Sequence, residues 1–350
     1  MTADPRRYPG RVRTFWTTLR AVLTRELRWR MRGRRAFVIA TVTVLVLGLV
    51  VFGIDALVSG SAADNARWQF SDGVTGEPIP VAGVSTSVSA VTGQSVFTGL
   101  LGLLTVLILL IAPALTSGAI ASEREKQTLE LLVTTPVSTL GMLVGKLLGS
   151  LVYVLLLIVA SVPLMSLVFA FGGVAPEDLL RAYLMLLALA FGMGALGLFL
   201  SALIGRTQVA TVVAYLVVFG LVVGTGALYT WMYASSASDD GFRQAERRHA
   251  PEALLWLNPL MADLDVVCSV IPVAGLCRVT EEVMGLPEDQ AVPPRDAFWP
   301  RSAAAFVAMG VLLTLLATQL VSPSRRARSG GRRWPTTGPP GGAAQGAGPA

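Results

Sequence analysis

The stretch SEREKQTLELLVTTPVSTLGMLVGK, residues 122–146, is a charged island between two long apolar runs. Ser122 followed by Glu125 forms a capping-box pattern, in which each side chain satisfies a free amide at the start of a helix. Pro136 disfavours helical backbone angles at the residue before it. The sequence therefore predicts a short, rigid helix from Ser122 to about Val133, followed by a break and a second helix.

The chain around this island predicts an all-α polytopic membrane protein. Of its 350 residues, 53% are hydrophobic and only 14% are charged, a composition too apolar for an ordinary soluble domain. A helix needs about 20 apolar residues to cross a bilayer. Six stretches reach or approach this length: 36–58, 97–120, 147–171, 179–204, 209–233 and 302–321. We expect Ser138 to cap the helix that contains the third stretch, 147–171.

The distribution of arginine predicts the orientation of these spans. Residues 1–35 carry eleven arginines, and the tail after Val321 carries five without any acidic residue. Positive charge marks the cytoplasmic ends of membrane helices, so both termini and the island are predicted to be cytoplasmic, which six spans allow. The outer loops then cover 59–96 and 234–301. Residues 322–350 are rich in Pro, Gly and Ala without periodicity, which predicts a disordered tail.

Within the basic segment 1–35, an amphipathic helix is predicted before the first span. Such a helix lies in the plane of the lipid headgroups with its arginines near anionic lipid; a simple basic stop signal is the alternative. Because the basic residues of this chain, whose net charge is +6, gather beside the predicted membrane, we expect lipid rather than nucleic acid as their partner. The apolar positions that recur at helical spacing are Phe15, Leu19, Val22, Leu23, Leu27 and Met31.

Glycines at helical spacing predict close contacts between helices. Two of these glycines, Gly141 and Gly145, come just before the third predicted span, and Gly149 lies at its start. The fifth span contains Gly220 and Gly224. Packing within one subunit and a seam between two subunits both remain open for these glycines.

The second outer loop holds both cysteines of the chain, Cys268 and Cys277. A disulfide between them and two free thiols are both compatible with the spacing, because an outer face permits disulfides. Residues 254–275 are apolar enough to enter the membrane, but Asp263 and Asp265 argue against a seventh span. We expect a re-entrant or surface-lying pair of helices there.

Few residues of this chain are suited to catalysis or to metal binding. With one histidine and two cysteines, no His/Cys metal site and no Cys/His catalytic pair is expected. The nearest approach to a Walker A loop, LGMLVGKLL at 140–148, lacks the first glycine and the Ser/Thr after lysine, so we expect no ATP on this chain. The spans carry no array of acids, which disfavours proton-driven transport. Two further hypotheses are a glutamate-type intramembrane protease, suggested by TEEVMGL at 280–286, and a non-transporting membrane scaffold.

The island, read as ASEREKQTLELLVTTPVSTLGMLVGKLL, resembles the signature of the type-two (ABC-2-type) family of ATP-binding-cassette (ABC) transporter permeases. In that family a helix reading E-R-E-x-x-T-L-E-x-L-L-x-T/S-P follows the second span, and G-K opens the third. Gln127 stands where the family has a glycine, which a helix tolerates well. The segment before the first span and LNPL at 257–260 also resemble the family. The matching positions are Glu123, Arg124, Glu125, Thr128, Leu129, Glu130, Leu131, Leu132, Thr135, Pro136, Gly145 and Lys146.

The resemblance implies a permease domain over residues 36–321 of a multi-pass plasma-membrane (cytoplasmic-membrane) protein, with no enzymatic activity of its own. It implies a separate cytosolic ATP-binding cassette subunit that carries ATP and Mg²⁺, a second permease copy or a sibling permease, and export as the usual direction. No cofactor and no metal is expected on this chain, and the cargo stays undefined. The family's coupling helix, which contacts the ATPase, corresponds to Glu123, Arg124, Glu125, Thr128, Leu129, Glu130, Leu132 and Pro136.

Overall fold

The computed structural model describes residues 11–30, 34–69, 88–127, 138–237, 252–268, 270 and 298–321, and these residues form helices, turns and short connections without any strand. The tail 322–350, the protease-like motif at 280–286 and much of both outer loops lie outside the described residues. The same holds for six of the predicted site residues, which are Thr128, Leu129, Glu130, Leu132, Pro136 and Cys277.

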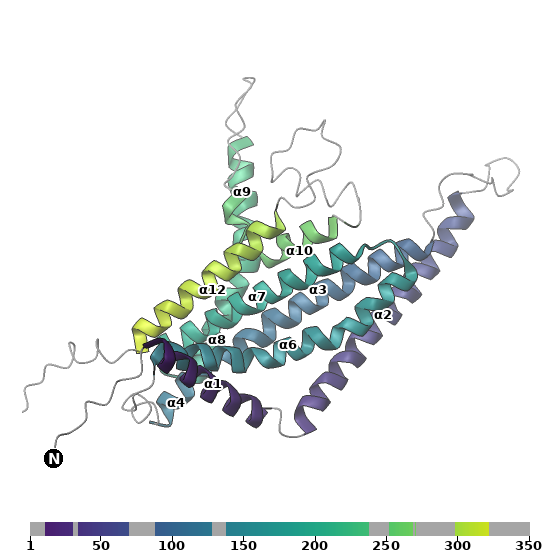
Figure 1. The fold of residues 1–350 in the computed structure, drawn as a ribbon. Helices are drawn as coiled ribbons and strands as arrows, with labels where there is room; N and C mark the ends of the chain where they lie inside the picture. The colour runs from purple at the N-terminus through teal and green to yellow at the C-terminus, as the bar shows by residue number, and fades with distance from the viewer. Residues whose placement is uncertain are drawn as a thin grey trace, which may run out of the picture.

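Four long helices run side by side and form the body of the molecule (Figure 1). They are α3 (Val88–Ser117), α6 (Thr139–Phe171), α7 (Pro176–Leu203) and α12 (Trp299–Val321). Helix α7 is the central one. In its apolar segment of 18 residues, 78% of the residues are buried, whereas in that of α12 only 28% are buried. Helix α2 (Arg34–Gln69) lies along one edge against α3 and α6. The core is therefore built around α7.

Among the described residues, five helices are long and apolar enough to cross a membrane, and they correspond to the second to sixth predicted spans. The first predicted span lies within α2, whose residues Thr41–Leu57 form a shorter apolar segment in the described part of the chain. The all-α polytopic fold is confirmed, whereas the count of six spans stays a prediction.

The turn between α6 and α7 requires glycine. Gly172 and Gly173 have positive φ angles of 86° and 84°, a region that L-residues with a side chain rarely enter. A Cβ at Gly173 would also lie 2.7 Å from the carbonyl oxygen of Ala90. Helix α7 then starts with Pro176 in its first turn, and the carboxylate of Asp178 accepts a hydrogen bond from the Ala175 N–H at 3.3 Å. The short connection holds α6 and α7 antiparallel.

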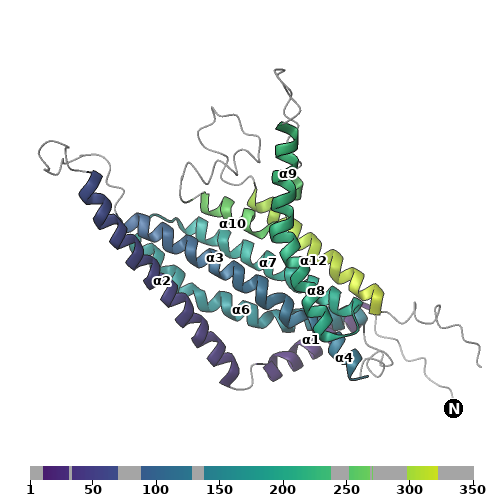
Figure 2. The same ribbon diagram turned by 180° about the vertical axis from the view of Figure 1, so that it is seen from behind.

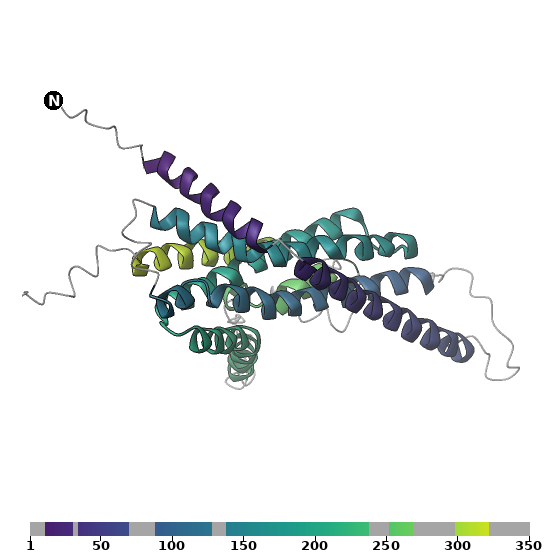
Figure 3. The same ribbon diagram turned by 90° about the horizontal axis from the view of Figure 1, so that it is seen from below.

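Both ends of the described chain come to the same end of the bundle. Helix α1 (Arg11–Arg30) lies across the start of α6 (Figure 3). At the other end of the sequence, Val321 of α12 packs in one apolar cluster with Ile120 and Met142. This arrangement is the one that an even number of crossings requires. That this end faces the cytoplasm stays a prediction.

The fifth predicted span is not one straight helix. It consists of α8 (Thr207–Phe219), a π-helical turn η1 (Gly220–Gly224) and α9 (Thr225–Ala237), and α9 turns away from the other helices (Figure 2). Single π-helical turns inside α-helices are rare and are often found at functional sites. Apolar periodicity does not reveal such a turn, so the sequence predicted a continuous span here.

Helix α10 (Pro259–Cys268) lies in the second predicted outer loop, after the short 3-10 turn η2 (Glu252–Leu254). Its ten residues are too few to cross a bilayer. It packs against α3, α7 and α12, and its residues Ala262 and Val266 belong to the main apolar cluster. Helix α10 is therefore part of the bundle core without being a span.

Replacing Gly197 by alanine tests the contact between α7 and α3. A Cβ at Gly197 would lie 2.9 Å from the backbone carbonyl oxygen of Pro113 and would also collide with the Thr116 hydroxyl. Overpacking of this kind costs about 1–3 kcal/mol, so we expect Gly197→Ala to lower the melting temperature of the purified protein. Gly102→Ala on α3 is the matched control, because the added methyl group meets no atom within 4 Å. Equal melting temperatures for both variants would contradict this packing.

Candidate functional site

The beginning of the island lies in a short helix, α4 (Ala121–Glu125), after a three-residue turn that follows α3, and residues 139–146 of the island form the start of α6. It carries Glu123, Arg124 and Glu125, three of the predicted contact residues. Gln127 ends this turn of helix with a φ angle of 56°, in the left-handed region. The predicted continuous helix from Ser122 to about Val133 is therefore wrong, because the backbone leaves helical geometry at Gln127.

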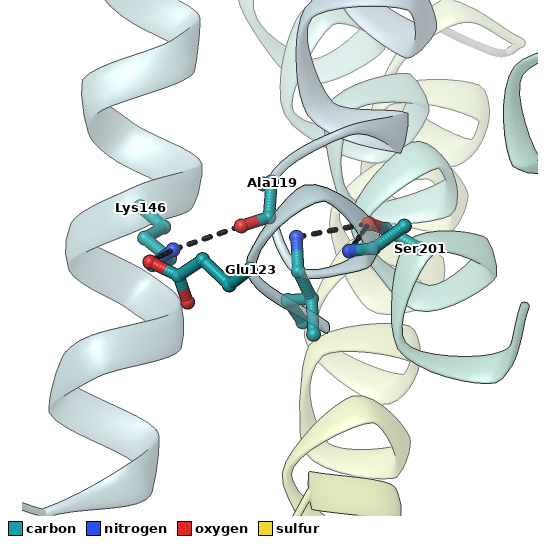
Figure 4. Close-up of polar contacts among 6 residues, drawn as sticks. Ala119, Glu123, Lys146 and Ser201 are labelled. Atoms are coloured by element: carbon teal, nitrogen blue, oxygen red, sulfur yellow. Dashed lines mark hydrogen bonds and ion pairs between the residues drawn. The ribbon is translucent and has the colours of Figure 1, made fainter. Parts of the chain in front are cut away.

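The predicted capping box of Ser122 and Glu125 is also wrong. The N-cap position of α4 is Ile120, which has no side-chain cap, and Ser122 lies inside the helix. The fully buried Ser201 of α7 takes this role instead, because its hydroxyl oxygen accepts hydrogen bonds from the N–H groups of Ile120 and Ala121, both at 2.9 Å (Figure 4). The first N–H groups of a helix have no partner within the helix. A serine 80 residues away along the chain thus caps α4.

Lys146 of α6 joins the start of the third span to the island. Its ammonium group donates a hydrogen bond to the Ala119 carbonyl oxygen at 2.8 Å and pairs with a Glu123 carboxylate oxygen at 2.5 Å (Figure 4). Only 9% of Lys146 is exposed, and a charge so deeply buried is tolerated only when it has such partners. The lysine therefore fastens both the turn and α4 to α6.

Arg124 and Glu125 join α4 to the other side of the bundle. The Arg124 guanidinium donates to the Ala202 carbonyl oxygen at the end of α7 at 3.0 Å. The Glu125 carboxylate accepts hydrogen bonds from the backbone N–H of Thr207 at 2.8 Å and from its hydroxyl at 3.0 Å. Since Thr207 is the first residue of α8, Glu125 places negative charge at a helix N-terminus, where the helix dipole favours it. Helix α4 is thus bonded to α6, α7 and α8.

The exposed surface of residues 121–127 is small and polar. Glu125, Lys126 and Gln127 are exposed, whereas Ala121 is buried and Ser122, Glu123 and Arg124 are partly buried. Glu125 is therefore both exposed and bonded to α8. A protein that docks on this end of the bundle would meet Glu125, Lys126 and Gln127 among the described residues of the island.

Helix α1 packs against the glycines at the start of α6. A Cβ at Gly141 would lie 3.1 Å from the Phe15 carbonyl oxygen, and one at Gly145 would lie 2.9 Å from the Val22 side chain. Gly149 is buried one turn further along α6. The cap that was predicted for this helix is present, since the Ser138 hydroxyl oxygen accepts a hydrogen bond from the Gly141 N–H at 3.1 Å. Helix α1 is therefore seated directly beside the island.

The second glycine pair behaves differently. A Cβ at Gly220 or at Gly224 would meet no atom within 4 Å, so this pair packs against nothing within the described part of the chain. Both residues bound the π-helical turn and lie on an exposed face of the fifth span. A role for Gly220 and Gly224 in contact with another subunit stays a prediction.

The described residues hold no group of three or more His, Cys, Asp or Glu side chains that could bind a metal ion. Cys268, the last residue of α10, is disulfide-bonded, and Cys277 lies outside the described residues. A disulfide between Cys268 and Cys277, one of the two alternatives that the sequence left open, therefore stays a prediction.

Sequence reasoning missed Ser201 and Thr207 as parts of the site. Ser201 lies in an apolar helix and Thr207 is the first residue of α8, and neither belongs to a sequence motif. The only local signal is that each is a polar residue at the end of a long apolar run on the island's side of the membrane. That signal does not say which backbone groups these side chains meet.

Comparison with known proteins identifies the chain at the level of a family. Residues 20–322 match the sequence model of the family described as ABC-2 family transporter protein. The match includes the island, α10 and every candidate span. No curated protein matches the chain.

Replacing Ser201 by alanine tests the cap on α4. The substitution leaves two buried N–H groups without an acceptor, and each such loss costs about 1–3 kcal/mol. We expect Ser201→Ala to speed amide hydrogen exchange at residues 119–125 by at least tenfold. Ser122→Ala is the matched control, because Ser122 was predicted to be the cap yet caps nothing in the structure. Faster exchange in Ser122→Ala than in Ser201→Ala would contradict the assignment.

Proposed function

Because the chain belongs to the ABC-2 family of transporter proteins, and is thus a multi-pass membrane protein and a permease subunit of an ABC transporter, we propose that α4 couples its spans to a separate ATP-binding subunit. The ATP-binding subunit docks on the end of the bundle where α4 and α1 lie. Binding of ATP and Mg²⁺ to that subunit moves α4, and α4 moves the spans.

The bonding of α4 to three helices is the observation that carries this proposal. Lys146 connects it to α6 through Glu123, Ser201 and Arg124 connect it to α7, and Glu125 connects it to α8. A loop held only by its two ends would absorb a displacement by bending. A segment that is bonded at four points to three spans passes a displacement on to all of them.

The direction and the assembly follow from the same proposal. The end of the bundle that holds α4 faces the cytoplasm, the protein lies in the plasma membrane, and transport is export. This chain binds neither ATP nor Mg²⁺, and it has no enzymatic activity. A second permease subunit, either a copy or a sibling, completes the path. The fifth span supports this pairing, because only 17% of the residues in its most apolar window are buried within the chain.

Substituting Glu125 tests the proposed coupling. Glu125→Lys replaces the two hydrogen bonds to Thr207 by a positive charge at the N-terminus of α8, which the helix dipole disfavours. We expect the complex with the ATP-binding subunit still to assemble in the membrane, but its ATPase and transport rates to fall by about tenfold or more. The measurement is the ATPase rate of the purified complex in lipid.

Lys126→Ala is the matched control for that experiment. Lys126 neighbours Glu125 and is exposed, so its loss leaves the bonds between α4 and α8 intact. We expect its ATPase rate to stay within twofold of the unmodified complex. If Glu125→Lys retained the full rate, the bond from α4 to α8 would have no part in coupling.

A further inference from the structure

A second group of polar residues lies in α10, apart from α4. Asp263 occupies the middle of α10 and is only 6% exposed. Both of its carboxylate oxygens are buried and have no hydrogen-bond partner in the described part of the chain. Thr105 of α3 is a polar neighbour of this carboxyl, and it is itself fully buried with an unpartnered hydroxyl. An ionised carboxylate in such a place would be strongly destabilised.

The charged groups around α10 do not relieve this burial. Helix α3 carries no charged residue between 88 and 117. On α7, Asp178 and Arg181 pair with each other at 3.0 Å, beside Glu177. The remaining charged groups are Arg301 on α12 and Asp265 on α10 itself, and an Asp265 carboxylate oxygen accepts the Trp299 N–H at 2.9 Å. Burial raises the pKa of Asp263 to about 7, and the Thr105 hydroxyl opposes this only in part.

Helix α10 connects three spans at the end of the bundle away from α4. Asn258 caps it, since its side-chain oxygen accepts the Leu260 and Met261 N–H groups at 3.0 and 3.3 Å. The Asn258 amide nitrogen donates to the Val222 carbonyl oxygen at 3.0 Å, within the π-helical turn of the fifth span. Asp265 caps α12 in turn. The seating of α10 therefore determines how α12 and the fifth span are held.

We propose that Asp263 is a proton-binding site that controls the docking of α10: the helix stays seated between α3, α7 and α12 only while this carboxyl holds its proton. When α10 leaves, the carboxyl meets water, and the proton passes from the acid to a water molecule. The proton does not drive transport. It sets the fraction of molecules in which the outer end of the bundle is closed, whatever the role of α4.

The direction of the pH effect follows from the raised pKa. An aspartate exposed to water has a pKa of about 3.9, so docking raises the affinity of Asp263 for a proton. Docking is therefore fully stabilised below about pH 4, and the stabilisation is lost as the pH rises through about 7. Between these two values, each pH unit lowers the ratio of docked to undocked molecules about tenfold, and above about pH 7 the ratio is constant because Asp263 is then ionised in both states.

Amide hydrogen exchange of residues 259–268 in the full chain, held in lipid, tests this proposal between pH 5.5 and 8.5. A ten-residue helix without its packing partners is unstable in water, so undocking exposes its amides. Asp263→Asn imitates the protonated acid and serves as the reference at each pH, because it cancels the intrinsic pH dependence of exchange. We expect the exchange rate of the unmodified protein relative to Asp263→Asn to rise about tenfold per pH unit from pH 5.5 to about pH 6.5 and to become constant above about pH 7.5. A constant ratio over the whole range overturns the proposal.

Two further variants keep the test decisive. Thr105→Val removes the hydroxyl that lowers the pKa of Asp263, so the pH at which the loss of protection levels off should move upward; an unchanged or lower value contradicts the proposal, even if Asp263→Asn fails to fold. Asp265→Asn keeps an oxygen that can accept the Trp299 N–H and should leave this pH unchanged. A shift of this pH in Asp265→Asn would assign the effect to Asp265 and overturn the proposal. None of these results depends on an ATP-binding subunit, so they are separate from the outcome of the coupling experiment.

Discussion

The buried ammonium group of Lys146 is the contact on which the arrangement of the island depends. It meets a backbone carbonyl oxygen of the turn after α3 and the carboxylate of Glu123 on α4. Because a buried charge is stable only with its partners in place, the second span, α4 and the third span are held in one geometry. Ser201 and Glu125 then extend this geometry to α7 and α8. Docking energy supplied at α4 would reach all of these helices together.

The same kind of hydrogen bond fixes helix positions at both ends of the bundle. In both places, a side chain from one segment satisfies the free backbone groups at the start of a helix in another. Glu125 does so for α8 and Ser201 for α4, whereas Asp265 does so for α12. In an apolar surrounding, an unpaired N–H is costly, so these contacts fix helix positions more firmly than apolar packing alone. The Asp263 carboxylate has no hydrogen-bond partner among the described residues, and the proposed undocking of α10 rests on this difference.

Two pairs of glycines with the same spacing have different packing partners. Gly141 and Gly145 receive α1, whereas Gly220 and Gly224 bound a π-helical turn and meet no atom of the described chain. Spacing alone states only that a close approach is allowed. Which surface makes use of it depends on where other helices fold. For the first pair, that surface is the N-terminal helix α1.

Local pattern was sufficient for the helical class, the second to sixth spans, the cap at Ser138 and the family, because hydropathy, capping residues and the island motif all act within a few residues of each other. It failed at Ser122, where a fitting capping box lost to Ser201, and at the π-helical turn, which has no hydropathy signal. It also excluded a seventh span from the presence of Asp263 and Asp265 without revealing that one is orphaned and the other caps α12. These outcomes depend on partners that lie about 35 to 160 residues apart along the chain. Contacts at such separations follow from how the helices pack, and no short-range pattern encodes them.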